Sequence, residues 1–337
     1  MLGRDSEARG RTSCESAEPL TITGVSNVEA EPAEVTCTSS PGDVEVLTPR
    51  DVPLGGPRAM SVRRTLPQKQ RSLIGAWCFC DHYGPDDVSM DVAPHPHTGL
   101  QTVSWLFTGE IEHRDSHGVH AFVRPGELNL MTGGSGIAHS EVSTAASSVL
   151  HGVQLWLALP DSNRDAPRDF QHYVPPTVVV DGAAVRVFLG SLAGSTSPVR
   201  TFTPLLGAEI VLPAGASLTL DVAQSFEHGV LLDTGDVTLG ATALSPGSLG
   251  YVGTGRSTLT LSSDEGARVV LLGGEPFGEE IVMWWNFVGR THDEIAAFRE
   301  EWQAETDRFG RVEGYPGDRL PAPPLPGGRL RPRGNPA

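Results

Sequence analysis

The sequence predicts an all-β protein in which two β-domains of one architecture follow each other in tandem. Along most of the 337 residues, short apolar runs rich in β-branched and aromatic residues alternate with turn residues. Glycine and proline are abundant, with 39 and 27 copies. A pattern in the first half, "FTGEIEHRD…VRPGELNLMTGGSG", is echoed in the second half by "LDTGDVTLGATALSPGSLGYVGTG". Because such self-similarity marks repeated structural units, we expect two domains of the same kind.

The predicted elements follow the chain in order. Residues 1–42 are polar and lack periodicity, so we expect a disordered N-terminal extension. The first β-domain is predicted over residues 43–160, and a more polar linker follows over 161–178. Strand-like runs resume in a second β-domain over 179–312, and a Pro/Gly-rich tail, extended or disordered, closes the chain over 313–337.

One segment has helical rather than strand periodicity. "THDEIAAFREEWQ" opens with Thr291, and Glu294 three residues later completes a capping box. Ile295, Phe298 and Trp302 then form an apolar stripe at helical spacing. We therefore predict a short C-terminal helix over about residues 291–305 that packs on a sheet.

The charge and the termini restrict the partners. The net charge of −16 argues against direct nucleic-acid binding, which needs clustered Lys and Arg, and against anionic membrane surfaces. A protein partner that itself binds DNA stays open. The N-terminus lacks the apolar core of a secretion signal, and no apolar stretch is long enough to span a membrane. We expect a cytoplasmic location.

The four cysteines are too few for a disulfide scaffold. Cys14 and Cys37 lie in the expected extension, whereas Cys78 and Cys80 form a "CFC" pair on a predicted strand. A metal or redox role for that pair is one interpretation. Small buried apolar side chains are the favoured one.

Two pairs of potential metal ligands stand out from this background. His95 and His97 are two apart in "APHPHTGLQTVSW", and His139 and Glu141 are two apart in "GGSGIAHSEVS". Residues two apart on a strand share one face, and a small β-barrel points alternate residues inward. We therefore expect three imidazoles and one carboxylate to meet inside the first domain.

Three neutral nitrogen donors and one carboxylate suit a borderline divalent metal. Fe(II), Mn(II), Ni(II), Co(II), Cu(II) and Zn(II) are all compatible, because affinity alone does not select among them. One carboxylate leaves a net charge of about +1, which would attract an enolate, phenolate or carboxylate. A six-coordinate ion would keep two adjacent positions open, whereas a structural zinc would close its sphere, and this alternative stays open.

Other residues near these pairs are weaker candidates. His113, His117 and His120 in "EHRDSHGVH" are alternative ligands or, more simply, residues of a loop at the barrel mouth. Gln101 and Gln154 are candidates to orient the ligands or to bind substrate. A further group of three could line a cavity or simply fill the core: Trp105, Met131 and Trp156. We find no nucleophile elbow, Walker A loop, dinucleotide fingerprint or HExxH motif.

The segments that contain both pairs resemble the pirin family, which has two domains of the cupin superfamily. The resemblance rests on "PHPHTGLQTVSWLFTGEIEHRDS", "PGELNLMTGGSGIAHSE" and "HGVQLWLALP", and it covers about residues 43–310. It implies tandem cupin barrels, of the double-stranded β-helix or jelly-roll type, with one metal, usually iron, in the N-terminal barrel. The family's ligands fall on His95, His97, His139 and Glu141. The second barrel is implied to be metal-free, and its only histidine between residues 200 and 275 is His228.

The resemblance also implies two functions. Some pirins act as quercetin 2,3-dioxygenases, which implies an Fe(II)-dependent enzyme that uses dioxygen to open a flavonol. As a carboxylate beside the open positions, Glu141 is the candidate base for the proton of the flavonol hydroxyl. Others are described as redox-sensitive partners of transcription factors or metabolic enzymes, which implies a non-enzymatic regulator. One departure bears on the enzyme: Gln101 stands in "HPHTGLQTV" where many members have Glu, so a carboxylate that could act as base or tune the metal is missing.

Overall fold

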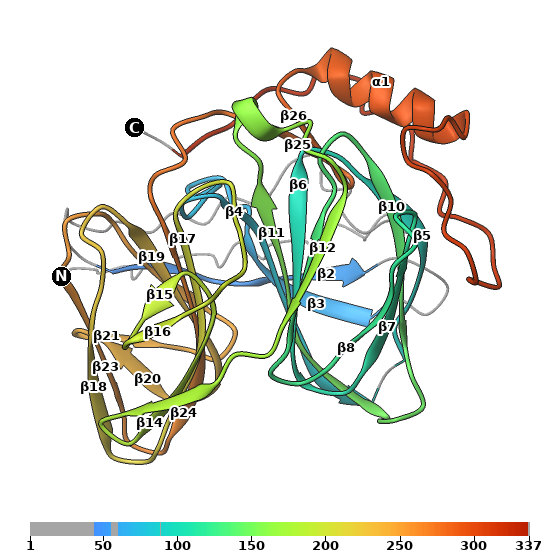
Figure 1. Ribbon diagram of the computed structural model, residues 1–337. Coiled ribbons are helices and arrows are strands. Elements are labelled where there is room, and N and C mark those ends of the chain that lie inside the picture. Colours follow the sequence, from blue (N-terminus) through green and yellow to red (C-terminus); the bar gives the residue numbers. More distant parts are fainter. Residues whose placement is uncertain (1–43, 55–59, 88, 336–337) are drawn as a thin grey trace, which may run out of the picture.

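The computed structural model describes residues 44–54, 60–87 and 89–335. They form two β-barrels that stand side by side (Figure 1), so the prediction of tandem β-domains is confirmed. The N-terminal extension expected over residues 1–42, with Cys14 and Cys37, lies outside the described residues.

The first barrel consists of a seven-stranded and a four-stranded antiparallel sheet. In the large sheet the order is β12-β9-β6-β11-β4-β3-β2, and in the small sheet it is β5-β10-β7-β8. The strands of the large sheet are β2 (Arg50–Leu54), β3 (Met60–Leu66), β4 (Trp77–Asp87), β6 (Leu100–Thr108), β9 (Leu128–Thr132), β11 (Val149–Ala158) and β12 (Asp169–Tyr173). Those of the small sheet are β5 (Asp91–His97), β7 (Ile111–Asp115), β8 (His120–Val123) and β10 (Ile137–Ser143).

The second barrel repeats this plan, with a seven-stranded sheet in the order β1-β22-β19-β24-β17-β14-β13 and a four-stranded sheet in the order β18-β23-β20-β21. The large sheet contains β1 (Glu45–Leu47), β13 (Thr177–Val180), β14 (Ala183–Leu189), β17 (Leu205–Leu212), β19 (Glu227–Gly235), β22 (Leu249–Val252) and β24 (Ala267–Gly274). The small sheet contains β18 (Ala216–Asp221), β20 (Val237–Leu239), β21 (Thr242–Leu244) and β23 (Thr258–Ser263). Two short hairpins, β15 (Ser191–Leu192) with β16 (Ser195–Thr196) and β25 (Val282–Trp284) with β26 (Phe287–Gly289), complete the strands.

The sequence echo corresponds to a structural repeat. The first copy spans β6 to β9 and the second spans β19 to β22. Each contains a Pro-Gly turn just before its last strand, and the turn glycines Gly126 and Gly247 have φ angles of 73° and 82°. Because only glycine adopts such angles without strain, the same turn chemistry is repeated in both barrels.

The packing differs from the expected domain boundaries at two places. The segment expected as a linker over 161–178 begins with a single 3-10 turn (Asp161–Asn163) and then supplies β12, which pairs with β9 of the first barrel. β1, expected in the first domain, pairs instead with β22 of the second barrel. The large sheet of the first barrel therefore includes β12 from the expected linker, and that of the second barrel includes β1 from the expected first domain.

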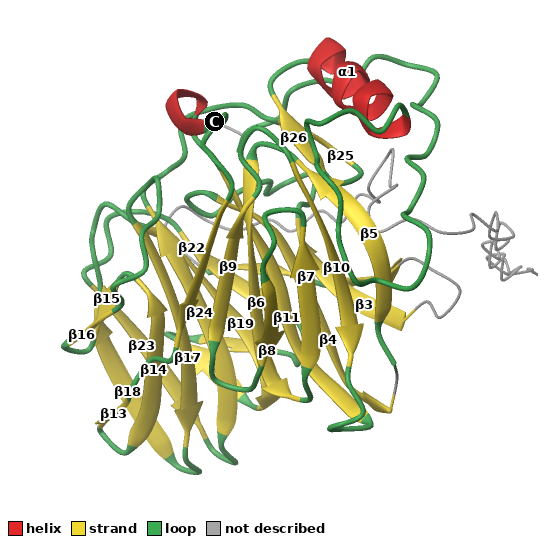
Figure 2. Ribbon diagram, turned by 45° about the vertical axis from the view of Figure 1, so that its right-hand side comes forward, coloured by secondary structure: helices red, strands yellow, loops and turns green. Residues whose placement is uncertain are grey.

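The end of the chain returns to the first barrel (Figure 2). The predicted helix is confirmed as α1 (His292–Gln303), with Thr291 and Glu294 forming both hydrogen bonds of the capping box. Its buried side chains pack with Trp285, Phe287 and Ala138 of β10. The described part of the tail beyond it, residues 304–335, contains no further helix or strand, but a single β-bridge joins Arg333 to Ile281 and Leu320 donates its backbone N–H to Pro94 O at 2.8 Å. Residues 281–335, which were expected to belong to the second domain or to an extended or disordered tail, thus cover one end of the first barrel.

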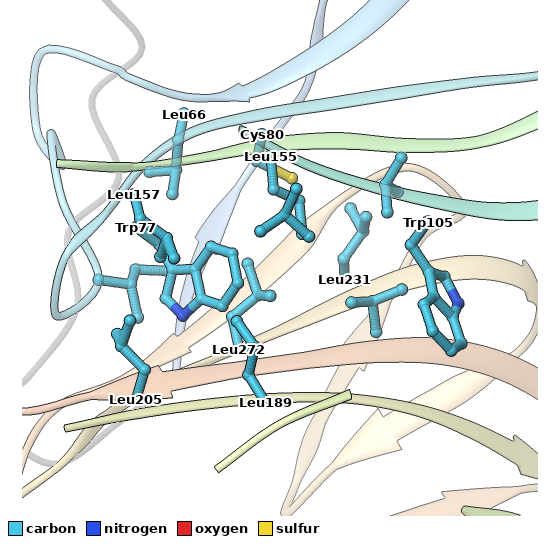
Figure 3. Packing of buried hydrophobic residues seen from close by; sticks show 14 of the residues in the cluster. Leu66, Trp77, Cys80, Trp105, Leu155, Leu157, Leu189, Leu205, Leu231 and Leu272 are labelled. Atoms are coloured by element: carbon cyan, nitrogen blue, oxygen red, sulfur yellow. The ribbon is translucent and has the colours of Figure 1, made fainter. Parts of the chain in front are cut away.

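A continuous apolar core joins the two barrels (Figure 3). Trp77, Cys80 and Leu155 from the first barrel meet Leu231 and Leu272 from the second. Because one buried apolar cluster contains side chains of both barrels, the two barrels pack as one unit. No helix in the described ranges has the length and apolar character needed to cross a membrane.

Candidate metal centre

The candidate centre is built on the paired strands β5 and β10. β5 is an edge strand, which accommodates Pro94 and Pro96 because an edge residue needs no N–H for pairing on its outer side. The two prolines alternate with His95 and His97, so both imidazoles are on the same face of the strand. His139 on β10 is the direct register partner of His95. The structure therefore brings these three histidines together.

The three rings converge closely. One nitrogen of each ring lies within 4.8 Å of the others, and all three residues are buried. The Nε2 atoms of His97 and His139 are 3.0 Å apart. The TGGSG turn before β10 permits this approach, because a Cβ at Gly133 would lie only 3.2 Å from the Cβ of His97.

The hydrogen bonds behind two of the rings fix their proton positions. The Nδ1 of His95 lies 2.9 Å from the carbonyl oxygen of Ala93, and the Nδ1 of His97 lies 3.1 Å from that of Asn286. A carbonyl oxygen only accepts, so each Nδ1 holds the proton and donates it. The Nε2 atoms of both neutral rings are therefore acceptors that point into the centre.

Burial keeps these histidines neutral. Desolvation lowers the pKa of His95 to about 4 and lowers the pKa values of His97 and His139 well below 6.5. Repulsion between the neighbouring imidazolium forms lowers the pKa values of His97 and His139 further. Neutral imidazoles with converging lone pairs are the donor set of a transition-metal site, so the residues fit such an ion.

Glu141 adds a carboxylate beside the triad. It is two residues after His139 on β10, where a bulge shifts the pairing with β5. Burial raises the pKa of Glu141, while nearby His113 and a hydrogen bond from Ser104 act in the opposite direction. The Ser104 hydroxyl lies 3.3 Å from Glu141 Oε1 and 2.9 Å from Gln154 Oε1, so these three polar groups form one network.

A small cavity adjoins His95, His97 and Glu141. The space open to the centre of a water-sized sphere is about 30 Å³, room for about two waters. Phe79 and Trp156 stack at 4.0 Å between ring centroids. The remaining lining residues are Val62, Asp81, Tyr83, Met90, Val92, Gln154 and Asn286.

Comparisons with known proteins identify the family. The pirin family model matches residues 59–157, and the model of the pirin C-terminal cupin domain matches residues 207–310. The chain belongs to the pirin family. The two pirin domains and the two barrels together confirm the prediction of tandem cupin barrels with a short C-terminal helix.

The chain is also similar to individual members of the family. It is 44% identical over 285 residues to a Pseudomonas aeruginosa protein named "Putative quercetin 2,3-dioxygenase", covering 83% of this chain and 90% of that one. A pirin-like protein of Caulobacter vibrioides is 34% identical over 256 residues, with 72% and 88% covered. The crystal structure of a quercetin 2,3-dioxygenase from Acinetobacter baumannii superposes with a TM-score of 0.81 at 37% identity, covering 86% and 98% of the two chains. This kinship and the histidine triad together imply a metal cofactor.

Of the other residues predicted for the site in this pirin, the structure places two in the cavity wall and three elsewhere. Gln154 and Trp156 line the cavity. Gln101 is on the opposite face of β6 from Ser104 and donates to Thr132 Oγ1 at 3.0 Å, so it does not orient the ligands. Trp105 shares that face and packs on Phe188 of the second barrel. Met131 is buried on β9 but is absent from the cavity wall.

Two of the three additional histidines differ from the expected mouth loop, whereas the cysteine pair agrees with its favoured interpretation. His113 is not on a mouth loop: it lies on β7, is buried, and contacts His139. His117 is in the β7–β8 turn, and His120 on β8 is exposed and pairs with Glu112. Cys78 and Cys80 point into different apolar clusters, as favoured, and burial raises both thiol pKa values to about 12.

Several contributors to the site were missed from the sequence. The backbone carbonyl of Asn286 reaches His97 from the C-terminal segment, and no side-chain pattern could reveal it. Phe79, Asp81 and Tyr83 are two residues apart on β4, so they share one face, and all three line the cavity. Asp81 is held by Arg64 through two hydrogen bonds of 2.7 and 2.8 Å. The spacing of the first, third and fifth residues of "FCDHY", which puts them on one face of a strand, was the available signal for this wall.

A second buried histidine cluster joins the two barrels. His82 and His151 of the first barrel each place Nε2 at 2.6 Å from Oδ1 of Asp233 on β19. Arg268 donates to the other oxygen of Asp233 at 3.2 Å, and Arg63 lies 3.5 Å from His82. The Asp233 carboxylate thus accepts from Nε2 of both imidazoles, and the positive charges of Arg268 and Arg63 beside this group oppose the binding of a further cation. The cluster is therefore an inter-barrel hydrogen-bond network rather than a second metal site.

Proposed function

We propose that this pirin holds one divalent transition metal through His95, His97, His139 and Glu141, with Fe(II) as the resident ion. We further propose that it acts as a dioxygenase of quercetin-like flavonols. The same donors accept Mn(II), Ni(II), Co(II), Cu(II) or Zn(II), so the metal must be identified on the purified protein.

The observation that supports this proposal most strongly is the convergence of three buried imidazoles, in which the Nε2 atoms of His97 and His139 are only 3.0 Å apart. Two acceptors at that distance repel unless a proton or a cation lies between them. A divalent ion would satisfy the three imidazoles, and Glu141 would reduce its charge to about +1. That residual charge favours an anionic oxygen ligand such as a deprotonated flavonol hydroxyl.

The chain's own residues would then divide the work. Glu141, whose pKa is raised by burial, is the group that would accept the proton of the flavonol 3-hydroxyl. Ser104 and Gln154 hold the Glu141 carboxylate and the polar side of the cavity in place. The stacked rings of Phe79 and Trp156 supply a flat apolar wall for an aromatic substrate. When bound, iron supplies Lewis acidity and one-electron chemistry with dioxygen.

The cavity volume supports a second candidate function. A space of about 30 Å³ admits water or dioxygen but no flavonol unless wall side chains such as Met90 or Trp156 move. A small, enclosed centre suits the alternative in which the oxidation state of the metal sets a surface conformation that a protein partner reads. This regulator needs no substrate pocket.

Anaerobic purification, metal analysis and an oxygen-electrode assay with quercetin and related flavonols separate the two. The matched variants are His97→Ala and Glu141→Gln, with the exposed His120→Ala as control. Stoichiometric iron, with oxygen uptake that is lost in the two site variants and kept in the control, would support the dioxygenase. Iron without turnover on any flavonol would favour the regulator, and absence of a bound transition metal would contradict both.

A further inference from the structure

A chain of three side chains runs from the triad into β7. His139 Nδ1 lies 3.4 Å from His113 Nδ1, and His113 Nε2 lies 3.1 Å from Oδ2 of Asp115. Asp115 and His113 are both buried, and they are the β7 register partners of His139 and Glu141. The third histidine of the triad, unlike the other two, thus has an imidazole instead of a carbonyl behind it.

The donor and acceptor roles are fixed at the Asp115 end of this series of side chains. Oδ1 of Asp115 accepts the backbone N–H groups of His117 and Val119 at 2.9 and 3.0 Å, which holds the carboxylate in the β7–β8 turn. Oδ2 faces His113 and can only accept. His113 must therefore hold its proton on Nε2, and in the neutral ring its Nδ1 is an acceptor.

The acceptor role of His113 Nδ1 in turn determines the tautomer of His139 in the triad. An acceptor at His113 Nδ1 requires the proton of His139 on its own Nδ1, so His139 Nε2 is left as an acceptor. The reverse assignment would put the proton of His139 on Nε2 and that of His113 on Nδ1. It would then turn an unprotonated His113 Nε2 toward the carboxylate, which is unfavourable in a buried site.

We infer that Asp115 acts through His113 as a positioning group that sets the tautomer of His139, so that its Nε2 lone pair is ready for the metal. This inference rests on the proposed metal centre, and it assigns a role to Asp115 and His113, which are not among the four proposed ligands. Metal-binding imidazoles are generally oriented by a direct hydrogen bond to an outer group. Here the carboxylate of Asp115 acts on His139 indirectly, through the hydrogen bonds of the His113 ring.

Asp115→Asn tests the inference with almost no change in shape. The two backbone N–H groups retain the Asn oxygen at the Oδ1 position, so the amide NH₂ turns toward His113. A donor there reverses each ring: His113 takes its proton on Nδ1, and His139 takes its proton on Nε2. An Asp→Asn change that leaves geometry intact but imposes the wrong histidine tautomer is known from the serine protease triad.

Two measurements on the full chain follow. The ¹⁵N chemical shifts of labelled histidines report the tautomer of His139 in the metal-free protein. Competition with a chelator reports the affinity for Zn²⁺, used as a diamagnetic probe. We expect an Nδ1-protonated His139 in the wild type, an Nε2-protonated His139 in Asp115→Asn, and a 10- to 100-fold loss of Zn²⁺ affinity.

Glu112→Gln is the matched control, because it removes a carboxylate of the same strand that, among the described residues, forms ion pairs with Arg114 and His120 and not with His113. It should leave both the tautomer and the affinity unchanged. His113→Phe is the second variant if Asp115→Asn does not fold: it removes the acceptor, so His139 should populate both tautomers and bind Zn²⁺ more weakly.

An unchanged His139 tautomer in Asp115→Asn, or equal Zn²⁺ affinity in the presence of a changed tautomer, would overturn the inference. Failure of the proposed function has a different signature. If the wild type binds no metal but the tautomer still follows residue 115, the relay stands and the proposed metal centre does not.

Discussion

The two barrels share a backbone plan but differ in what their small sheets place inside. In the first barrel, β5 and β10 put His95 opposite His139, next to His97. In the second barrel, the corresponding strands β18 and β23 put Leu218 opposite Leu261 and Leu220 opposite Leu259. The strand order is the same in both sheets, β5-β10-β7-β8 and β18-β23-β20-β21. The capacity for metal chemistry therefore comes from a few side chains and not from the fold.

The difference also has an energetic side. The leucines of the second barrel belong to an apolar cluster and stabilise it by burial. The histidines of the first barrel are buried polar groups, and in the tautomers inferred above the Nε2 acceptors of His97 and His139 face each other at 3.0 Å in the metal-free protein. An unsatisfied buried polar group costs about 1–3 kcal/mol, so the first barrel gives up stability in its metal-free state for a binding site.

The largest expected effect comes from giving the first barrel the interior of the second. His97→Leu with His139→Leu should abolish stoichiometric metal binding and any metal-dependent oxygen uptake. The free energy of unfolding of the metal-free protein should rise, by about 1–3 kcal/mol for each acceptor removed. Metal analysis and urea titration measure the two effects, and His120→Leu on the surface is the control. Metal retained in the double variant would contradict the assignment of the site.

The link between the barrels should be the next most sensitive feature. Burial alone would raise the pKa of Asp233, but hydrogen bonds from His151 and His82 hold it well below its ordinary value. Its carboxylate thus stabilises the folded state above about pH 4, and this contribution is lost as pH falls through the lowered folded-state pKa.

Asp233→Ala should reduce the free energy of unfolding by about 3–5 kcal/mol, because it leaves two buried imidazole N–H groups without their acceptor and removes one of the two carboxylates that pair with Arg268. Urea denaturation at pH 7 gives this value. The exposed Asp221 on β18 provides the control, and Asp221→Ala should change stability by less than about 0.5 kcal/mol. Equal effects of the two variants would show that the inter-barrel network is not a stabilising contact.

The interior of the second barrel is not wholly apolar, and its exception yields a pH prediction. His228 is fully buried, and within the described part of the chain neither ring nitrogen has a hydrogen-bond partner. Burial lowers its pKa from 6.5 to about 4. Between these values the unfolded state binds a proton that the folded state does not, so stability falls as the pH falls from 6.5 toward 4.

His228→Leu should remove this contribution, which amounts to at most about 1.4 kcal/mol per pH unit. Urea titrations at several pH values between 7 and 4 compare the slopes of the variant and the wild type. The exposed His120→Leu serves as the control and should keep the wild-type slope. A slope in His228→Leu as steep as that of the wild type would locate the acid sensitivity elsewhere.

Sequence periodicity was sufficient for the parts of the site that lie on regular strands. His95, His97 and His139 followed from residues two apart on two strands. Gln101 did not, because the turn at Gly99, with φ of 66°, separates β5 from β6, so alternation could not be counted from His97. His113 was assigned to a loop although Ile111, His113 and Asp115 alternate as in a strand with one buried face.

The remaining parts depended on long-range packing, which local patterns do not encode. The carbonyl of Asn286 contacts His97 across 189 residues of sequence. β1 and β12 complete sheets of barrels to which their sequence neighbourhood did not assign them. The tail over 313–337 was expected to be extended or disordered because of its Pro and Gly content, yet Ala322 is buried in the apolar cluster that contains Trp302 of α1 and Ala138 of the first barrel. Proline-rich backbone can be ordered by side-chain packing without any regular structure.

The smallest effect concerns one hydroxyl group in each barrel. Tyr83 of the first barrel is buried in the cavity wall, and its hydroxyl has no partner among the described residues. Tyr251 of the second barrel donates to Glu227 Oε1 at 2.9 Å. Tyr83→Phe should therefore raise the free energy of unfolding of the metal-free protein by about 1 kcal/mol, whereas Tyr251→Phe should lower it by about 1–3 kcal/mol.

Opposite signs in urea titration would show that the first barrel keeps an unpaired donor beside its centre at a cost in stability. Such a donor has a use only if a ligand or ordered water enters the cavity. Oxygen uptake or ligand affinity should then fall in Tyr83→Phe and not in Tyr251→Phe. If both variants lose stability, the Tyr83 hydroxyl already has a permanent partner such as a buried water, and the two barrels treat their tyrosines alike.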